Sequence, residues 1–228
     1  MAATLHESVL DQWGEGIVSG KYLPGDRISL DDEVTGQKAS RTVGREAMRV
    51  LESMGMVTVK RKSGAVVNPP ARWHSFDPQL ISWRLDSDDR AAQLHALSEL
   101  RLAVEPVAAR LAALNASAQQ WADLTEAAIT MAANSDQADQ PAYLDADMRF
   151  HATLLAASGN YMFESLSGVV KAVLQGRTRH GLMPSHANPE AVQLHVDIAA
   201  AVGAKDADRA EAAMREIVEE ADHAVQQA

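Results

Sequence analysis

The sequence predicts a mostly α-helical protein, in which an N-terminal winged helix-turn-helix over residues 1–70 precedes a C-terminal all-helical bundle. Only 4% of the 228 residues are aromatic whereas alanine is abundant, and this composition favours helix. A basic hairpin pattern ends at Pro69-Pro70, and every pattern that follows it is helical. The distribution of charge changes at the same point, which also indicates two parts.

The charge is divided unevenly along the chain. The net charge is −10, yet residues 1–70 carry nine basic and nine acidic side chains, so the whole deficit lies in residues 71–228. Residues 38–62 hold seven basic side chains against two acidic ones. This asymmetry is typical of a small nucleic-acid-binding module joined to a larger acidic domain, although a solvated charged helix would show the same count.

Several classes of protein are excluded by what the sequence lacks. Without cysteine there is no disulfide framework and no thiolate metal site. No apolar run approaches the roughly 18 residues that span a bilayer, so no membrane association is expected. The first residues lack a basic start followed by an apolar stretch, so we expect no signal peptide and a cytoplasmic location.

The N-terminal part is predicted to hold three helices and a hairpin. Apolar residues at helical spacing predict a helix over residues 5–18. A weaker pattern, with few apolar residues on one face, predicts a short helix over residues 30–36. Ser40 is a plausible N-cap and Gly55 a C-cap for a helix over 41–54. The hairpin joins β-like runs at 57–60 and 65–68.

This order of elements is that of a winged helix-turn-helix, whose third helix enters the major groove of DNA. Arg41, Arg45 and Arg49 recur every four residues on one face of that helix, so they can reach phosphates and guanine edges together. The tip of the hairpin is basic, and Gly64 would let the backbone approach DNA closely. The alternative is an ordinary salt-bridged helix followed by a hairpin.

The C-terminal part is predicted to be entirely helical. The expected helices are listed from the first to the last: residues 78–85, 90–114, 118–133, 141–158, 161–179, 189–203 and 207–225. Ser117 with Gln120 fits a capping box, and Asp206 is positioned to cap the last helix. We therefore divide the chain into a winged domain at 1–70, a linker with a short helix at 71–88, and a helical domain at 89–228.

Four polar residues occupy positions where helical periodicity predicts a core: Arg101, Asp147, His151 and His195. Burial without partners would cost several kcal/mol each, so we expect them to meet inside the bundle. Asp147 and His151, four apart, share one helix face and suit a metal site, and a lone arginine suits a carboxylate ligand. The alternative is a purely structural network, in which Asp147 pairs with His151 or with Arg101.

Two segments of the N-terminal part have the character of a family motif: LPGDRI at residues 23–28 and SRTVGREAMRVLESMGMV at residues 40–57. With them, this part resembles the DNA-binding domain of the GntR superfamily of bacterial transcription regulators. It departs from the family pattern at Lys38-Ala39, Val43 and Gly44. The resemblance implies contacts with double-stranded operator DNA from one helix and from the wing: Arg41, Thr42, Arg45, Arg49, Lys60, Arg61, Lys62 and Gly64.

The C-terminal part resembles the all-helical effector domain, called FCD, of the FadR branch of that superfamily. The matching segments are ELRLAVEP at 99–106, DMRFH at 147–151, SGN at 158–160 and LHVDI at 194–198. Residues 73–85 are similar to the linker of members that respond to sugar acids such as galactonate. In metal-binding members an aspartate and three histidines hold a divalent ion, often zinc, and a small carboxylate completes the shell.

This resemblance implies metal ligands at Asp147, His151 and His195, with Arg101 as the carboxylate anchor. Ile217 stands where the family pattern has its third histidine, so this chain lacks one of the four expected metal ligands. The leading hypothesis is a homodimeric, ligand-responsive repressor that binds an inverted repeat and is not an enzyme. The alternatives are a metal-dependent hydrolase that uses the Asp/His/His site, and a regulator that senses the metal itself or an acyl thioester.

Overall fold

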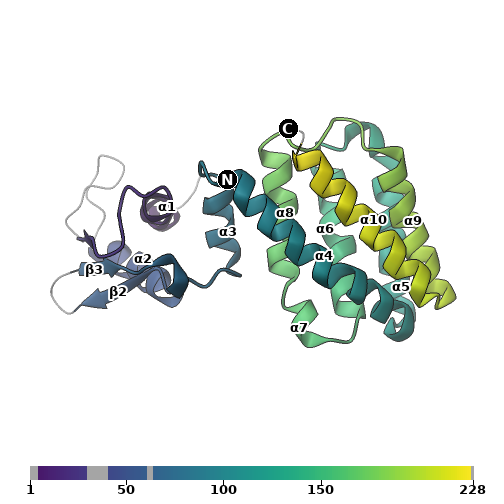
Figure 1. The fold of residues 1–228 in the computed structure, drawn as a ribbon, viewed down its shortest axis with the longest axis horizontal. Coiled ribbons are helices and arrows are strands. Elements are labelled where there is room, and N and C mark those ends of the chain that lie inside the picture. Colours follow the sequence, from purple (N-terminus) through teal and green to yellow (C-terminus); the bar gives the residue numbers. More distant parts are fainter. Residues whose placement is uncertain (1–4, 30–40, 61–63, 227–228) are drawn as a thin grey trace. The chain divides into compact units, whose positions relative to one another are not determined.

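The computed structural model describes residues 5–29, 41–60 and 64–226. The chain forms two compact units, Met1–Arg90 and Ala91–Ala228, which are shown in Figure 1 and described separately below. Most described residues are helical and the strands are few and short, so the predicted mostly α fold class is confirmed. No described helix combines the length and the apolar character needed to cross a membrane.

In its described part, the first unit contains a small antiparallel sheet and three α-helices. Its elements as far as the hairpin are α1 (Leu5–Val18), β1 (Arg27–Ile28), α2 (Arg41–Ser53), β2 (Val57–Lys60) and β3 (Gly64–Val67). The predicted hairpin is present as β2 and β3, and β1 adds to its other edge to give the order β1-β3-β2. Strand β1 was not predicted, since two residues are too short to show an alternating pattern.

The core of this unit is built from the predicted apolar stripe of α1. Val9, Trp13 and Ile17 are buried, and they pack in one cluster with residues of α2 such as Leu51 and of the sheet such as Ile28. The short helix expected over 30–36 and its neighbour Ser40 lie outside the described residues.

Helix α3 (Pro78–Leu85) has the predicted bounds and is integrated into the first unit. Its Leu80 and Trp83 join the same apolar cluster, and the Trp83 indole Nε1 donates to Asp11 Oδ1 at 3.0 Å. Gly14 of α1 faces the Trp83 ring so closely that a Cβ there would lie 2.4 Å from it. Residues 71–88, expected as a linker with a short helix, therefore pack as part of the N-terminal unit because a tryptophan anchors them.

The second unit is a bundle of helices without any strand in its described part. They are α4 (Arg90–Asn115), α5 (Ala118–Ala133), α6 (Pro141–Ala157), α7 (Tyr161–Glu164), α8 (Ser167–Arg179), α9 (Pro189–Ala204) and α10 (Ala207–Gln226). The prediction of one helix over 161–179 is wrong, because this segment forms two helices, α7 and α8. The Leu166 N–H bonds to Phe163 O, three residues back, and this tighter turn separates α7 from α8.

The predicted caps of the second unit are confirmed. Ser117 and Gln120 form a reciprocal capping box at the start of α5, and Asp206 Oδ1 accepts from the Arg209 N–H at the start of α10. Helix α6 packs between α5 and α8, while α9 packs against α5 and α10. The core residues Phe150 and Leu154 place one face of α6 inside the bundle, and this arrangement positions the polar residues of the same helix.

Candidate metal centre

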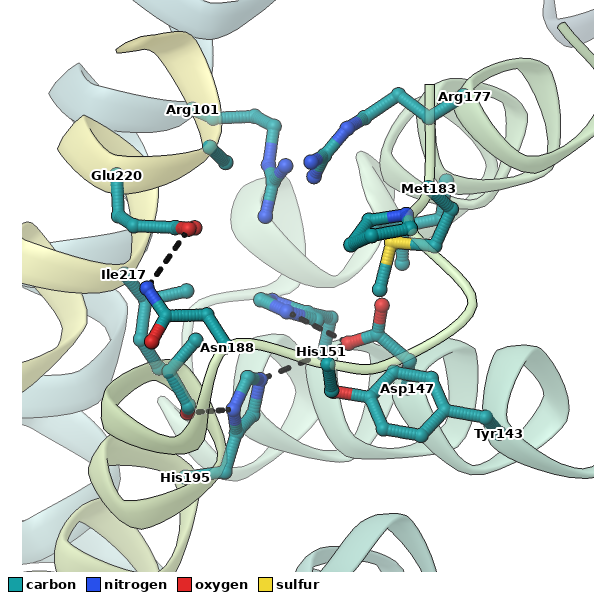
Figure 2. A pocket seen from close by; sticks show the side chains of 15 residues that line it. Arg101, Tyr143, Asp147, His151, Arg177, Met183, Asn188, His195, Ile217 and Glu220 are labelled. Atoms are coloured by element: carbon teal, nitrogen blue, oxygen red, sulfur yellow. Dashed lines mark hydrogen bonds and ion pairs between the residues drawn. The ribbon is translucent and has the colours of Figure 1, made fainter. Parts of the chain in front are cut away.

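A cluster of charged and imidazole side chains lies inside the second unit (Figure 2). The structure brings together all four residues that the sequence predicted, Arg101 from α4, Asp147 and His151 from α6, and His195 from α9. Each of them is at most 8% exposed, and Glu105 of α4, which is fully buried, joins them. The polar positions on apolar stripes therefore converge, as periodicity predicted.

His151 and His195 both direct their Nε2 atom toward Asp147 Oδ1. His195 Nδ1 lies 2.7 Å from the Ala191 carbonyl oxygen and donates to it, so its Nε2, 3.6 Å from Asp147 Oδ1, is the nitrogen that faces the carboxylate. His151 Nδ1 lies 2.7 Å from Glu105 Oε2, a short ionic contact that is not aligned as a hydrogen bond, and its Nε2 is 3.3 Å from Asp147 Oδ1. Three potential ligand atoms, Asp147 Oδ1, His151 Nε2 and His195 Nε2, therefore lie close together.

These residues fit a divalent ion. One ligand atom from each of Asp147, His151 and His195 lies within 4.8 Å of the other two. Asp147 Oδ1 and His195 Nε2 are buried, and neither has a hydrogen-bond partner among the described residues. A metal would satisfy both atoms, and Glu105 and the Ala191 carbonyl already orient the two rings from behind, as outer partners do in histidine metal sites.

The charges in the cluster are strongly coupled. Burial opposes the ionisation of Glu105, but Arg101 and His151 outweigh it and hold the pKa of that carboxyl at about 2. Burial likewise opposes ionisation of Asp147, whose pKa lies well below its usual range because His151 and His195 surround it. Although burial alone would lower it, the pKa of His151 is raised to about 9 by Glu105 and Asp147. Metal binding must therefore displace a proton from His151.

Arg101, predicted as the carboxylate anchor, is already paired. Its Nε lies 2.6 Å from Glu105 Oε1 and its Nη2 lies 3.3 Å from Glu105 Oε2, so the guanidinium fork holds an internal carboxylate. Sequence reasoning did not single out Glu105, although it follows Arg101 by four residues and so shares its helix face. The pair joins the arginine to the metal site through His151.

Sequence reasoning also missed Arg177, at the end of α8. This side chain is only 9% exposed, and Figure 2 shows its guanidinium group pointing toward that of Arg101. Its pKa is lowered, first by burial and then by the positive charge of Arg101. A basic residue in the last turn of a helix is ordinarily exposed, but the stripe Val170, Leu174 and Arg177 shows that this one faces the core.

These side chains line a cavity of about 80 Å³ inside the second unit. That volume exceeds the ~15 Å³ that one water needs, and it suits a small acid better than an acyl thioester. Asn188 donates to Glu220 Oε1 at 3.1 Å at one side of the cavity. Ile217, where the resemblance led us to expect a histidine, is buried and contributes an apolar wall.

The predicted DNA-contacting residues lie in the first unit. Thr42, Arg45 and Arg49 are exposed on α2, and Lys60 is exposed at the end of β2. Arg41 is the first residue of α2, and its side chain lies outside the described part, as do Arg61 and Lys62.

Gly64 has a role within the first unit. Its φ is +78°, and a Cβ there would lie 2.3 Å from the Ile28 carbonyl oxygen. The pairing of β1 with β3 therefore requires a glycine at this position, whereas the sequence suggested close approach to DNA as its reason.

Comparisons with known proteins agree with this architecture. The FCD domain family matches residues 96–220. The galactonate operon transcriptional repressor of Escherichia coli K12 is 33% identical over 202 residues, which cover 88% of this chain and 87% of the relative. An HTH-type transcriptional regulator of the same organism, YieP, is 27% identical over 164 residues, 72% of this chain and 71% of the relative.

Solved structures show the same fold. Streptococcus agalactiae GntR has a TM-score of 0.51 at 24% identity and covers 96% of this chain and 100% of its own. E. coli McbR/YncC has a TM-score of 0.55 at 20% identity, with 99% of each chain covered. The predicted winged helix-turn-helix with a helical domain is thereby confirmed.

The fold and the relatives together define a transcriptional regulator, and the hydrolase alternative is excluded because the relatives are regulators. The chain belongs to the GntR family of transcription regulators that carry an FCD domain.

Proposed function

We propose that this regulator is a repressor that binds operator DNA as a homodimer and responds to a small carboxylate, such as a sugar acid, held together with a divalent metal. The observation that carries the proposal is the convergence of Asp147, His151 and His195 with buried arginines around one small cavity. A buried cavity with unsatisfied ligand atoms and cationic walls is suited to an ion and an acid.

The proposed DNA interface is the exposed face of α2 with the wing. The residues assigned to it are Arg41, Thr42, Arg45, Arg49, Lys60, Arg61, Lys62 and Gly64. Exposed arginines spaced by four on the helix can contact phosphates and guanine edges from one side. A two-fold symmetric dimer would present two such helices to an inverted repeat.

The proposed metal is zinc, held by Asp147, His151 and His195. Three protein ligands leave open coordination positions, and the bound ion supplies a Lewis-acid centre for an oxygen of the acid. Glu105 holds the His151 ring in place, and the Ala191 carbonyl holds that of His195. A sugar acid is the leading ligand class because a relative with 33% identity is the galactonate operon repressor.

Regulation follows if the acid favours a conformation whose two DNA-binding units no longer match the half-site spacing. Fluorescence anisotropy tests this with the zinc-loaded chain and DNA from upstream of its own gene, with and without galactonate, gluconate or lactate. We expect saturable, sequence-dependent binding and an operator affinity that falls at least about fivefold with one of the acids. Binding equal to that of random DNA at moderate salt would reject the proposal.

A further inference from the structure

We propose that Arg177 is the anion anchor of the cavity, meaning the side chain that binds the carboxylate of the effector, and that this effector carries a single negative charge. Arg101 then serves as a positioning residue for the metal site. The inference rests on the proposed function and makes it more specific, since it assigns the ligand contact to a residue outside the sequence motifs.

The two buried arginines differ in whether their hydrogen-bond donors have acceptors. Arg101 donates from Nε and Nη2 to Glu105, at 2.6 and 3.3 Å. Among the residues that the structure describes, none forms a hydrogen bond or an ion pair with the Arg177 side chain, and its Nε is fully buried without an acceptor. A buried donor without an acceptor is costly, and a carboxylate is the acceptor that matches a guanidinium fork.

Arg177 is positioned to reach a ligand in the cavity. Its guanidinium group points into the same cavity as Asp147 and faces Arg101, as Figure 2 shows. Two buried cations repel one another, and this repulsion together with burial disfavours the charged form of Arg177. An anion placed between Arg177 and the metal ligands would remove both penalties at once.

The charged groups around the cavity limit the charge of the ligand. Arg101, Arg177 and a divalent ion bring four positive charges to the cavity, while Glu105, Asp147 and Glu220 bring three negative ones. Histidines that bind a metal are neutral, so one positive charge remains. A monocarboxylate neutralises it, whereas a dicarboxylate would leave an uncompensated negative charge inside the bundle.

Polar groups of the wall indicate what the rest of the ligand carries. Tyr143, Asn188 and Glu220 line the cavity and offer a hydroxyl, an amide and a carboxylate, which are partners for ligand hydroxyls. Ile217 and Met183 close other parts of it with apolar surface. The chemical class is therefore a hydroxylated monocarboxylate.

The role of Arg101 follows from its contact with Glu105. Glu105 also touches His151 Nδ1 at 2.7 Å, so Arg101 fixes the carboxylate that orients a metal ligand. Loss of Arg101 should then weaken metal binding, as loss of outer-shell partners generally does. Loss of Arg177 should spare the metal and weaken only the acid.

The test uses the full chain and two measurements on each variant. Zinc affinity is measured by competition with a chromophoric chelator, and affinity for galactonate, gluconate, lactate and galactarate by calorimetry on the zinc-loaded protein. The variants are Arg177→Gln, Arg177→Lys and Arg101→Gln, and the matched control is Arg179→Gln, an exposed arginine on the same helix. Thermal melting of the metal-free variants reports folding.

We expect Arg177→Gln to weaken the acid that binds best by about 10- to 100-fold and to change zinc affinity by less than about twofold. Arg177→Lys should recover part of the loss, and Arg179→Gln should behave as wild type. Arg101→Gln should weaken zinc about 10- to 100-fold. Metal-free Arg177→Gln should melt no lower than wild type, because it removes an unpaired buried charge.

Three results would overturn the inference. Wild-type acid affinity in Arg177→Gln would reject the anchor while leaving the proposed function intact. Tighter binding of galactarate, the dicarboxylate with the same carbon skeleton as galactonate, would reject the single charge. Failure of wild type to bind any of the acids, with intact operator binding, would reject both the effector proposal and this assignment.

Discussion

Two arginine–glutamate pairs of nearly equal length lie in the two units. In α2, Arg49 Nη1 lies 2.7 Å from Glu46 Oε1, and the two side chains are 71% and 51% exposed. In α4, Arg101 Nε lies 2.6 Å from Glu105 Oε1, and the two side chains are 4% and 1% exposed. The residue types and the distance are nearly the same and each pair spans about one helical turn, three residues in α2 and four in α4, so burial is the main difference.

Burial determines whether an ion pair can exchange its partners. The exposed pair gains about 0–1 kcal/mol in water, so a DNA phosphate can replace Glu46 as the partner of Arg49. The buried pair cannot exchange partners without leaving a charge in a medium of low polarity. The first pair is therefore available for recognition, and the second is a fixed support for His151.

The largest expected effect comes from removal of the buried acid. Glu105→Ala should lower the free energy of unfolding by about 3–5 kcal/mol, because Arg101 and His151 lose their common partner. Urea denaturation of the metal-free chain measures it. Glu46→Ala is the matched control and should change stability by less than about 1 kcal/mol. Equal losses of stability in the two variants would show that burial does not distinguish the two ion pairs.

The next effect is the pH dependence of the metal-free chain. The folded pKa of His151 is raised to about 9 from the ordinary value of about 6.5. Its contribution to stability is therefore complete below about pH 6.5 and is lost as the pH rises to about 9, which amounts to about 3 kcal/mol. Urea denaturation at pH 6, 7.5 and 9 checks this decline.

The zinc-loaded chain is the control for that decline. Its His151 is already deprotonated, so His151 should add no loss of stability over the same pH range. If the metal-free chain were as stable at pH 9 as at pH 6, His151 would not be charged next to Glu105.

A substitution on the exposed face of α2 should lower the affinity for DNA without unfolding the protein. Arg45→Ala should weaken operator binding by about 1–3 kcal/mol and leave zinc and acid binding unchanged, because the side chain is exposed in the other unit. Anisotropy and calorimetry on the same sample separate the two affinities. A lower affinity for zinc in this variant would contradict the division of roles between the units.

The smallest expected effect concerns the missing fourth ligand. Ile217→His places an imidazole in the wall of the cavity and should tighten zinc binding on the order of tenfold, because a further nitrogen donor joins the set. In the metal-free chain the same change should lower the melting temperature, since it buries a polar ring without a partner. Chelator competition and thermal melting measure the two effects, and unchanged zinc affinity would show that position 217 lies outside ligand reach.

Much of the fold could be predicted from local patterns. The apolar stripe of α1 and the Ser117–Gln120 capping box are recognisable within a few residues of sequence, so their prediction did not depend on distant contacts. Strand β1 and the break between α7 and α8 could not be predicted, because pairing with β3 defines the first and a single turn defines the second.

Motifs in the sequence indicated the family, and local patterns indicated the helical architecture. Helical periodicity marked the four polar residues on apolar stripes that meet in the bundle, but the partner of each of these residues is known only from the tertiary structure. Arg101 is bound to Glu105 within its own helix, and Arg177 of another helix lacks an acceptor among the described residues. Hydrogen-bond satisfaction depends on the packing of several helices at once, so no pattern along one helix reveals it.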